Sequence, residues 1–240
     1  MAKSCLDLSG KVAVVFGATS GLGKAIGIGL AEHGAAVVPT GRRAEWPSDV
    51  ADRASIRALR DRVLAQFSRV DILVNAAGQT FRKSTAAVED AEWAALFETN
   101  LTGVLHACQE FYEPLKASGA GRVITIASLG SFVAFHEVAA YCASKAAVLS
   151  LTRSLACEWA RDGICVNAIA PGVFPTELNA HLLTGTDRGR EILQRTPMKR
   201  FGDPRELIGA AVLLASDGAS FMTGECLVVD GGYLASGVNS

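Results

Sequence analysis

The chain has 240 residues, of which 50% are hydrophobic and 20% are charged, and its formal net charge is -1. This size and apolar content predict one globular domain, residues 1–240, with a full hydrophobic core. The near-neutral charge offers no basic surface for nucleic acid or an anionic membrane, and no uncharged apolar run approaches the ~18 residues of a membrane span.

Cysteine and histidine patterns argue against a metal or disulfide framework. The six cysteines are scattered without a C-x-x-C pair, and the four histidines show no ligand spacing. We therefore expect free thiols in a reducing compartment and no metal site. The first ten residues lack the apolar core of a secretory signal, so we expect a cytoplasmic protein.

Apolar runs alternate along the chain with helical segments. Strands are expected at 12–18, 35–40, 71–78, 122–128, 164–171 and 226–232. Helices are expected at 21–33, 53–67, within 89–117, at 139–161, within 177–195 and at 204–215. Continuous apolar strands between helices are typical of a parallel sheet buried on both faces, which predicts a doubly wound α/β fold. Ligands bind such sheets at the carboxyl ends of the strands.

A glycine-rich turn joins the first strand to the first helix. Its glycines allow a tight turn and close approach to a pyrophosphate, and the following helix N-terminus faces the anion. A merely tight turn is the alternative. The expected phosphate-binding residues are Gly17, Thr19, Ser20, Gly21, Leu22 and Gly23.

The end of the second strand bears on the choice of dinucleotide. An acidic residue there would bind the adenosine ribose and favour NAD. Gly41 occupies this place and is followed by Arg42 and Arg43. A guanidinium can hold a 2′-phosphate through paired hydrogen bonds, so these residues favour NADP(H). NAD, with the two arginines as a solvated pair, is the alternative.

A third signal is the pair Tyr141 and Lys145, preceded by Ser128. Residues four apart lie on one helical face. An ammonium beside a phenol favours the phenolate and lowers its pKa, which makes a proton shuttle near neutral pH. The Y-x-x-x-K pattern alone is common on amphipathic helices, so its weight comes from the other motifs.

From Lys11 to Gly232 the chain resembles the short-chain dehydrogenase/reductase family, which implies a Rossmann-like fold. One departure is Phe16, where the family usually has a threonine that helps to tie the glycine turn together. The motifs that carry the resemblance are the glycine turn, Asn75-Ala76-Ala77-Gly78, Asn100, Ser128, Tyr141-x-x-x-Lys145 and the segment from Pro171 to Thr176.

The resemblance implies a catalytic tetrad. Tyr141 would be the general acid or base, and Lys145 would lower its pKa and bind the nicotinamide ribose. Ser128 would hold the substrate oxygen, and Asn100 would anchor a water that relays protons. Donors aimed at the substrate oxygen would stabilise its growing charge during hydride transfer. The structural alternatives are a buried helix residue for Asn100 and a strand-end cap for Ser128.

Further cofactor contacts also follow from the resemblance. Asp49 and Val50 would meet the adenine, although Asp49 could instead cap the helix that begins near Arg53. The remaining expected contacts are Asn75, Ala76 and Gly78 along the adenosine ribose, and Pro171, Gly172 and Thr176 towards the nicotinamide.

The segment between Gly41 and Asp49 is shorter than this family requires. A helix and a third strand usually lie here, yet a parallel crossover needs at least ~10–12 residues. We therefore expect the third strand to be absent or a stub, leaving six main strands. Trp46-Pro47 forms either a lid over the adenine side or a patch over the truncated sheet edge, and we favour the patch.

The substrate is less constrained by sequence. Residues 177–200 form the expected lid, with breaks at Gly185 and Gly189. Arg82 and Lys83 either grip a carboxylate or are solvated cations, and His136 and Glu137 either bind a polyhydroxylated substrate or line the rim.

The C-terminal half resembles the gluconate 5-dehydrogenase and deoxygluconate dehydrogenase branch, so we expect a sugar acid or polyol. A 3-oxoacyl-carrier-protein reductase is the alternative enzyme. A cofactor-binding regulator without turnover and a structural assembly protein are alternatives of other classes.

The resemblance also implies a homotetramer formed through the two central helices. Their apolar faces would equally suit burial within one subunit. The residues concerned are Leu101, Val104, Leu105, Val148, Leu151 and Leu155.

Overall fold

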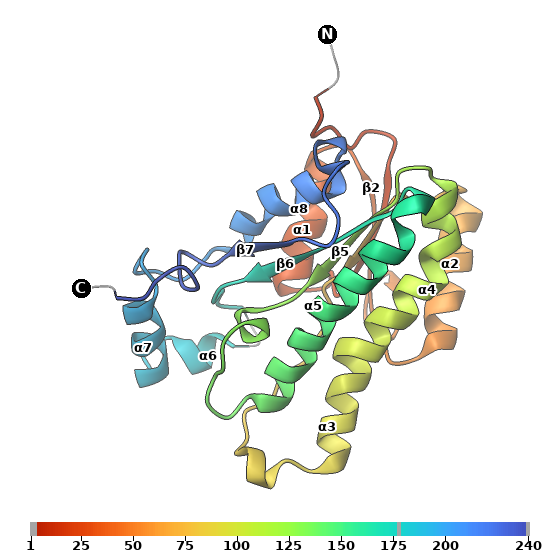
Figure 1. The fold of residues 1–240 in the computed structure, drawn as a ribbon. Coiled ribbons are helices and arrows are strands. Elements are labelled where there is room, and N and C mark those ends of the chain that lie inside the picture. The colour runs from red at the N-terminus through yellow and green to blue at the C-terminus, as the bar shows by residue number, and fades with distance from the viewer. Residues whose placement is uncertain (1–3, 177–178, 239–240) are drawn as a thin grey trace.

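The computed structural model describes residues 4–176 and 179–238 and shows a parallel β-sheet between two layers of helices (Figure 1). The strand order is β3-β2-β1-β4-β5-β6-β7, and every pairing is parallel. The strands are β1 (Val12–Phe16), β2 (Ala36–Gly41), β3 (Trp46–Pro47), β4 (Ile72–Asn75), β5 (Arg122–Ile126), β6 (Cys165–Pro171) and β7 (Cys226–Val229). The order reverses between β1 and β4, where a doubly wound sheet opens a crevice for ligands. The predicted fold class is confirmed.

The helices cover the sheet on both faces. Helices α1 and α8 lie on one face, and α2, α4 and α5 lie on the other (Figure 1). Helices α6 and α7 project beyond the carboxyl ends of β6 and β7. The helices are α1 (Gly21–Glu32), α2 (Arg53–Phe67), α3 (Asp90–Phe97), α4 (Gly103–Ala117), α5 (Ala139–Trp159), α6 (Ala180–Leu183), α7 (Asp187–Arg195) and α8 (Ile208–Ala215).

Alternation along β1 explains how the two layers form. Val12, Val14 and Phe16 belong to the apolar cluster beneath α2, α4 and α5, whereas Ala13 and Val15 belong to the cluster beneath α1 and α8. All five side chains are buried. Successive strand side chains point to opposite faces, so an uninterrupted apolar strand supplies both cores.

The shortened crossover takes the form of a stub. Residues 42–45 are turns and bends, and β3 pairs only with the last two residues of β2. The sheet therefore has seven strands only when this two-residue strand is counted. The ring centroids of Trp46 and Phe67 lie 6.1 Å apart. The guanidinium of Arg62 lies 4.8 Å from the ring centroid of Trp46. Trp46 thus packs against α2 and the core, as the patch interpretation predicts.

Several predicted boundaries shift. The strand expected at 71–78 ends at Asn75 because residues 76–78 leave the sheet towards the site. The helical stretch within 89–117 is divided by a π-helical segment, Glu98–Thr102. The lid's first residues, 177 and 178, lie outside the described residues. Among the residues described, no helix is long and apolar enough to cross a membrane.

Candidate active site

The glycine turn lies at the crevice between β1 and β4. The backbone nitrogens of Gly17 and Ala18 donate to the carbonyl of Thr40, at 3.0 and 3.2 Å. Gly17 has φ +77°, and a Cβ there would lie 2.6 Å from the backbone nitrogen of Ala77. A Cβ on Gly23 would lie 2.3 Å from the carbonyl oxygen of Gly17. Both positions exclude a side chain, which leaves backbone open to a bound anion at the start of α1.

The other turn residues line the same place. Thr19 and Ser20 are exposed, and Ser20 directly precedes α1. A Cβ on Gly41 would lie 3.2 Å from Cγ2 of Thr19, so the turn abuts the end of β2. Leu22 packs against the apolar cluster under α1 and α8. The structure therefore brings together the glycine turn, the start of α1 and the end of β2, as predicted.

Phe16 departs from the family pattern without disturbing this turn. Its side chain is 1% exposed and meets the ring of Phe111 edge-on, with centroids 6.1 Å apart. The residue has become part of the core beneath α4. The turn is held instead by the backbone bonds to Thr40.

Two arginines lie where the adenosine end of the cofactor is expected. Arg42 and Arg43 are exposed, and neither forms an ion pair with any residue that the structure describes. Asp49 accepts a hydrogen bond from the nitrogen of Ala51 at 3.0 Å. The helix-cap alternative for Asp49 is wrong, because the carboxylate of Asp52 caps α2.

Val50 lies near the base of the same crevice. A Cβ on Gly103 would be 2.6 Å from the carbonyl oxygen of Val50, so this segment packs directly onto the first turn of α4. Val50 also lines a small pocket together with Asn75 and Ala77. The sequence-predicted adenine and ribose segments are thus adjacent.

The segment after β4 connects this side to the tetrad. Asn75 is buried and donates to Sγ of Cys108 at 3.5 Å, and the nitrogen of Ala76 donates to the carbonyl of Phe16 at 3.1 Å. A Cβ on Gly78 would lie 3.4 Å from Oδ1 of Asn100 and 3.6 Å from Nζ of Lys145. Gly78 therefore borders the catalytic groups.

Asn100 lies in the π-helical segment and is fully buried. Its Oδ1 accepts from the nitrogen of Gln79 at 2.8 Å, and its Nδ2 donates to the carbonyl of Gln79 at 2.9 Å and to Oγ of Ser144 at 3.1 Å. A π-helical insertion is frequent at functional sites, since it re-aims one side chain within a helix. Sequence reasoning missed Gln79 and Ser144, whose only signal was their nearness to motif residues.

Three further groups meet where β5 ends and α5 begins. Ser128 follows β5 and accepts from the nitrogen of Gly130 at 3.0 Å. Nζ of Lys145 donates to the carbonyl of Ile126 at 2.7 Å and lies 5.9 Å from the ring centroid of Tyr141. Burial lowers the pKa of Lys145 from 10.5 to about 8. A buried ammonium of this kind can gain or lose a proton in the neutral to mildly basic range.

The pKa of Tyr141 moves opposite to our expectation. Burial raises it, and a hydrogen bond with Ser128 opposes part of that rise. The predicted lowering by Lys145 is wrong for this arrangement because the ammonium is directed to Ile126. Tyr141 is therefore held as a protonated phenol that can donate a proton, with Ser128 beside it.

The segment after β6 closes the far end of the crevice. Pro171 ends β6, and the nitrogen of Gly172 donates to the carbonyl of Val229 at 2.8 Å. The nitrogen of Thr176 donates to Oδ1 of Asn179 at 2.7 Å. A Cβ on Gly21 would lie 3.4 Å from Cγ2 of Thr176, so Thr176 lies over the start of α1.

The rim residues are mutually paired. Nε of Arg82 lies 2.6 Å from a carboxylate oxygen of Glu137, and Nζ of Lys83 lies 2.7 Å from that of Glu92. The His136 side chain is 81% exposed. Glu137 adopts φ +63°, a conformation uncommon for a residue with a side chain. Arg82 and His136 thus meet at Glu137, on the loop before Tyr141.

The cysteines and acidic residues form no metal centre in the part of the chain that the structure describes. All six cysteines are free thiols. The features of the crevice fit a nicotinamide dinucleotide: a backbone cradle kept open by Gly17 and Gly23, a strand-end pair of arginines and a proton-bearing tyrosine next to a buried lysine.

Comparisons with known proteins agree with this geometry. The family model described as "Enoyl-(Acyl carrier protein) reductase" matches residues 17–234. A 2-dehydro-3-deoxy-D-gluconate 5-dehydrogenase of Dickeya dadantii is 37% identical, over 98% of this chain and 100% of that protein. A D-threitol dehydrogenase of Mycolicibacterium smegmatis is 38% identical, over 94% of each.

A solved structure is also similar throughout its length. The gluconate 5-dehydrogenase from Burkholderia cenocepacia, in complex with NADP and tartrate, has a TM-score of 0.92 and 37% identity, over 97% of this chain and 98% of that one. Together with the family match, the relatives and the motif geometry, this shows that the chain belongs to the short-chain dehydrogenase/reductase family of oxidoreductases.

Proposed function

We propose that this protein is an NADP(H)-dependent oxidoreductase that interconverts a secondary alcohol and a ketone on a sugar acid or polyol. The observation that carries the proposal is the convergence of Asn100, Ser128, Tyr141 and Lys145 beside the glycine-rich phosphate cradle. When bound, the nicotinamide exchanges a hydride with the substrate carbon.

The four residues of the catalytic tetrad transfer the proton of the substrate hydroxyl group. Tyr141 donates to the ketone oxygen during reduction and accepts from the alcohol during oxidation. Ser128 donates a hydrogen bond to the same oxygen and stabilises its developing negative charge. Lys145 binds the nicotinamide ribose and returns the proton to Tyr141, and Asn100 anchors the water that resupplies it. The opposing effect of Ser128 on the raised pKa of Tyr141 supports this assignment, because it requires the two hydroxyls to be neighbours.

The cofactor is NADP(H), with NAD(H) as the alternative. Arg42 and Arg43 stand exposed where a 2′-phosphate would lie, and a guanidinium pairs well with a phosphate. Asp49 and Val50 hold the adenine, and Thr176 meets the carboxamide. A solved relative was crystallised with NADP.

The substrate class rests on the matched relatives. Several of their names specify a sugar acid or a polyol, namely 2-dehydro-3-deoxy-D-gluconate, D-threitol and glycerol. These names support the main proposal over a 3-oxoacyl-carrier-protein reductase. A regulator without turnover would not need the aligned proton donors, and so it is the weaker proposal.

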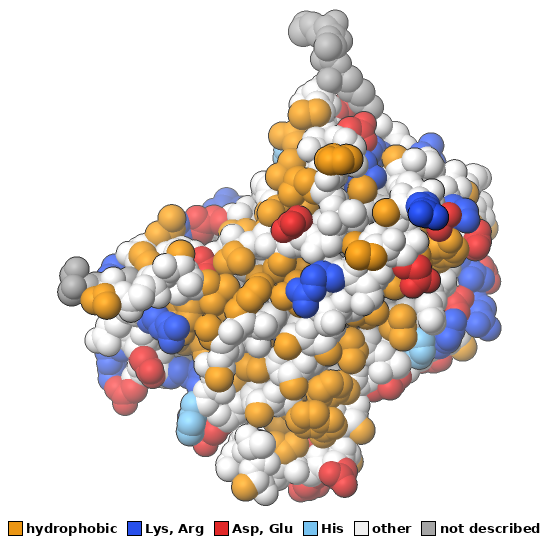
Figure 2. All heavy atoms as spheres, viewed as in Figure 1, with side chains coloured by type: hydrophobic (Ala, Val, Ile, Leu, Met, Phe, Trp, Pro, Cys, Tyr) orange, Lys and Arg blue, Asp and Glu red, His pale blue; other side chains and the backbone are white. Residues whose placement is uncertain are grey.

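We also propose one catalytic domain, residues 1–240, with residues 177–200 as the substrate lid, located in the cytoplasm and assembled as a homotetramer. Val104, Val148 and Leu155 are buried within the subunit, but Leu101 and Leu151 remain partly exposed. Figure 2 shows hydrophobic side chains gathered over α3 and the adjoining end of α4, beside α5. A surface of this kind on α4 and α5 supports the assembly.

The test is oxidation of a substrate panel. Purified protein is mixed with NADP⁺ or NAD⁺ and with D-gluconate, other sugar acids, tetritols and glycerol, and reduced cofactor is followed by absorbance. The proposal requires turnover of at least one of these alcohols, faster with NADP⁺ than with NAD⁺. Cofactor binding without turnover of any panel member would favour the regulator.

A further inference from the structure

The lid helix α7 is anchored to the active-site loop by apolar contacts. Leu129, which directly follows Ser128, is buried in one cluster with Leu183 of α6, Ile192 of α7 and Tyr233. The contact orients α7 against the stretch that separates Ser128 from Tyr141. The buried side of α7 therefore faces the loop that follows Ser128.

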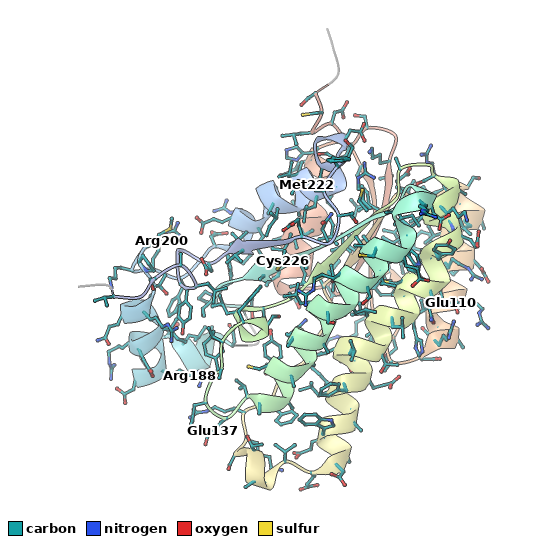
Figure 3. All side chains as sticks on the ribbon, viewed as in Figure 1. Glu110, Glu137, Arg188, Arg200, Met222 and Cys226 are labelled. Atoms are coloured by element: carbon teal, nitrogen blue, oxygen red, sulfur yellow. The ribbon has the colours of Figure 1, made fainter. Side chains whose placement is uncertain are left out.

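Arg188 lies on that side of α7. Residues 188, 192 and 195 share one helical face. Ile192 is buried in the apolar cluster, and the guanidinium of Arg195 lies 4.7 Å from the ring centroid of Tyr233. Nη1 of Arg188 donates to the carbonyl of His136 at 3.4 Å, which joins α7 to the loop that carries Glu137 (Figure 3).

The cations around the mouth differ in how their charge is balanced. Arg82 is matched by Glu137 and Lys83 by Glu92, each within 2.7 Å. Arg188 has only the neutral carbonyl of His136, and nothing within residues 4–176 and 179–238 gives it an ion pair. Arg188 is half-buried, and a guanidinium that meets no counter-charge among the described residues favours the arrival of an anion.

The charge of Arg188 also reaches the start of the catalytic helix. Burial raises the pKa of the Cys142 thiol, and the positive charge of Arg188 opposes that rise. Cys142 directly follows Tyr141. The guanidinium of Arg188 therefore lies close enough to the start of α5 to act on the Cys142 thiol.

We propose that Arg188 binds the carboxylate of a sugar-acid substrate and thereby selects acids over neutral polyols. This inference rests on the proposed function and narrows its substrate class. A guanidinium can hold a carboxylate through two parallel hydrogen bonds. Because Arg188 belongs to the lid, a carboxylate would also tie α7 to the bound substrate. Arg82, already paired with Glu137, shapes the rim instead.

The test compares two ligands with the same six-carbon chain, D-gluconate and D-glucitol, which differ by a terminal carboxylate. Their binding to the NADP⁺-saturated protein is measured by titration calorimetry in wild type and in Arg188→Met, Arg188→Lys and Arg190→Met. Arg190 is the matched control, because it is exposed on α7 and paired with Asp187. In wild type, D-gluconate should bind more tightly than D-glucitol.

Arg188→Met should weaken D-gluconate binding by ~10-fold or more and leave D-glucitol binding unchanged, because a charge-assisted hydrogen bond to a carboxylate is lost. Arg188→Lys should restore part of the loss, and Arg190→Met should resemble wild type. Equal binding of the two ligands by wild type overturns the inference. So does an Arg188→Met variant that retains D-gluconate affinity, or that weakens both ligands equally.

Turnover distinguishes this inference from the proposed function. If Arg188-dependent D-gluconate binding is found but no panel alcohol is oxidised, the inference stands and the proposed oxidoreductase function fails. If D-glucitol and other polyols are oxidised while Arg188→Met leaves acid binding unchanged, the function stands and the inference fails.

Discussion

Replacing Lys145 by methionine should stabilise the cofactor-free protein at pH 7. The buried ammonium has its pKa lowered from 10.5 to about 8, which corresponds to ~3 kcal/mol of destabilisation below pH 8 at ~1.4 kcal/mol per pKa unit. The bond to the carbonyl of Ile126 offsets ~1.5 kcal/mol of this. Methionine has a similar length and no charge, so the net gain should be about 1–2 kcal/mol.

The sign of the pH dependence provides the sharper test. The folded state binds its proton less tightly than the unfolded chain, so the penalty in wild type is largest below the folded pKa of about 8. It disappears as the pH rises towards 10.5. The advantage of Lys145→Met should therefore shrink by about 2 kcal/mol between pH 7 and pH 9.5.

Urea unfolding of both proteins at these two pH values measures the difference. Lys24→Met, at an exposed position on α1, is the control and should not change the pH dependence of stability. A difference between Lys145→Met and wild type that stays constant from pH 7 to pH 9.5 would refute the reasoning. Lys145→Met should also lose turnover, because its ammonium serves the proposed proton path.

Two further substitutions probe the cofactor site. Gly17→Ala places a Cβ 2.6 Å from the backbone nitrogen of Ala77, at φ +77°. The variant should lose ~2 kcal/mol or more of folding stability and bind NADPH at least ~10-fold more weakly in a fluorescence titration. A variant with wild-type NADPH affinity would contradict the assignment of this turn as the phosphate cradle. The double variant Arg42→Ser with Arg43→Ser should weaken NADPH binding ~10–100-fold and leave NADH binding unchanged. Equal loss for both cofactors would instead indicate a general effect on the β2 end.

Strong local signals predicted the frame of the fold. Helix α2 was expected at 53–67 and is found there, because Asp52 caps its start and apolar residues at helical spacing face the core. The β1 strand could be identified because both of its faces are buried. The short Gly41–Asp49 segment predicted the stub, because it cannot hold the crossover that the family usually has there.

Features set by tertiary contacts could not be predicted. The π-helical segment around Asn100 depends on bonds to Gln79 and Ser144, which lie in other elements. The direction of the Tyr141 pKa depends on where the Lys145 ammonium points, and only the fold determines its bond to Ile126.

The partners of the cations at the rim of the site also could not be predicted from the sequence. The sequence left Arg82 as either a carboxylate anchor or a solvated cation, and the fold pairs it with Glu137. Arg188 carried no motif signal, since its place beside His136 arises from the packing of α7 against the loop that follows β5.

The most direct test of the central claim is the initial rate of NADPH formation from NADP⁺ and the best panel alcohol, in wild type and in Tyr141→Phe. The variant removes the single hydroxyl that exchanges the substrate proton. We predict a rate lower by ~10²–10⁴-fold with NADPH affinity unchanged. A variant that forms NADPH at the wild-type rate would contradict the assignment of Tyr141 and, with it, the proposed mechanism.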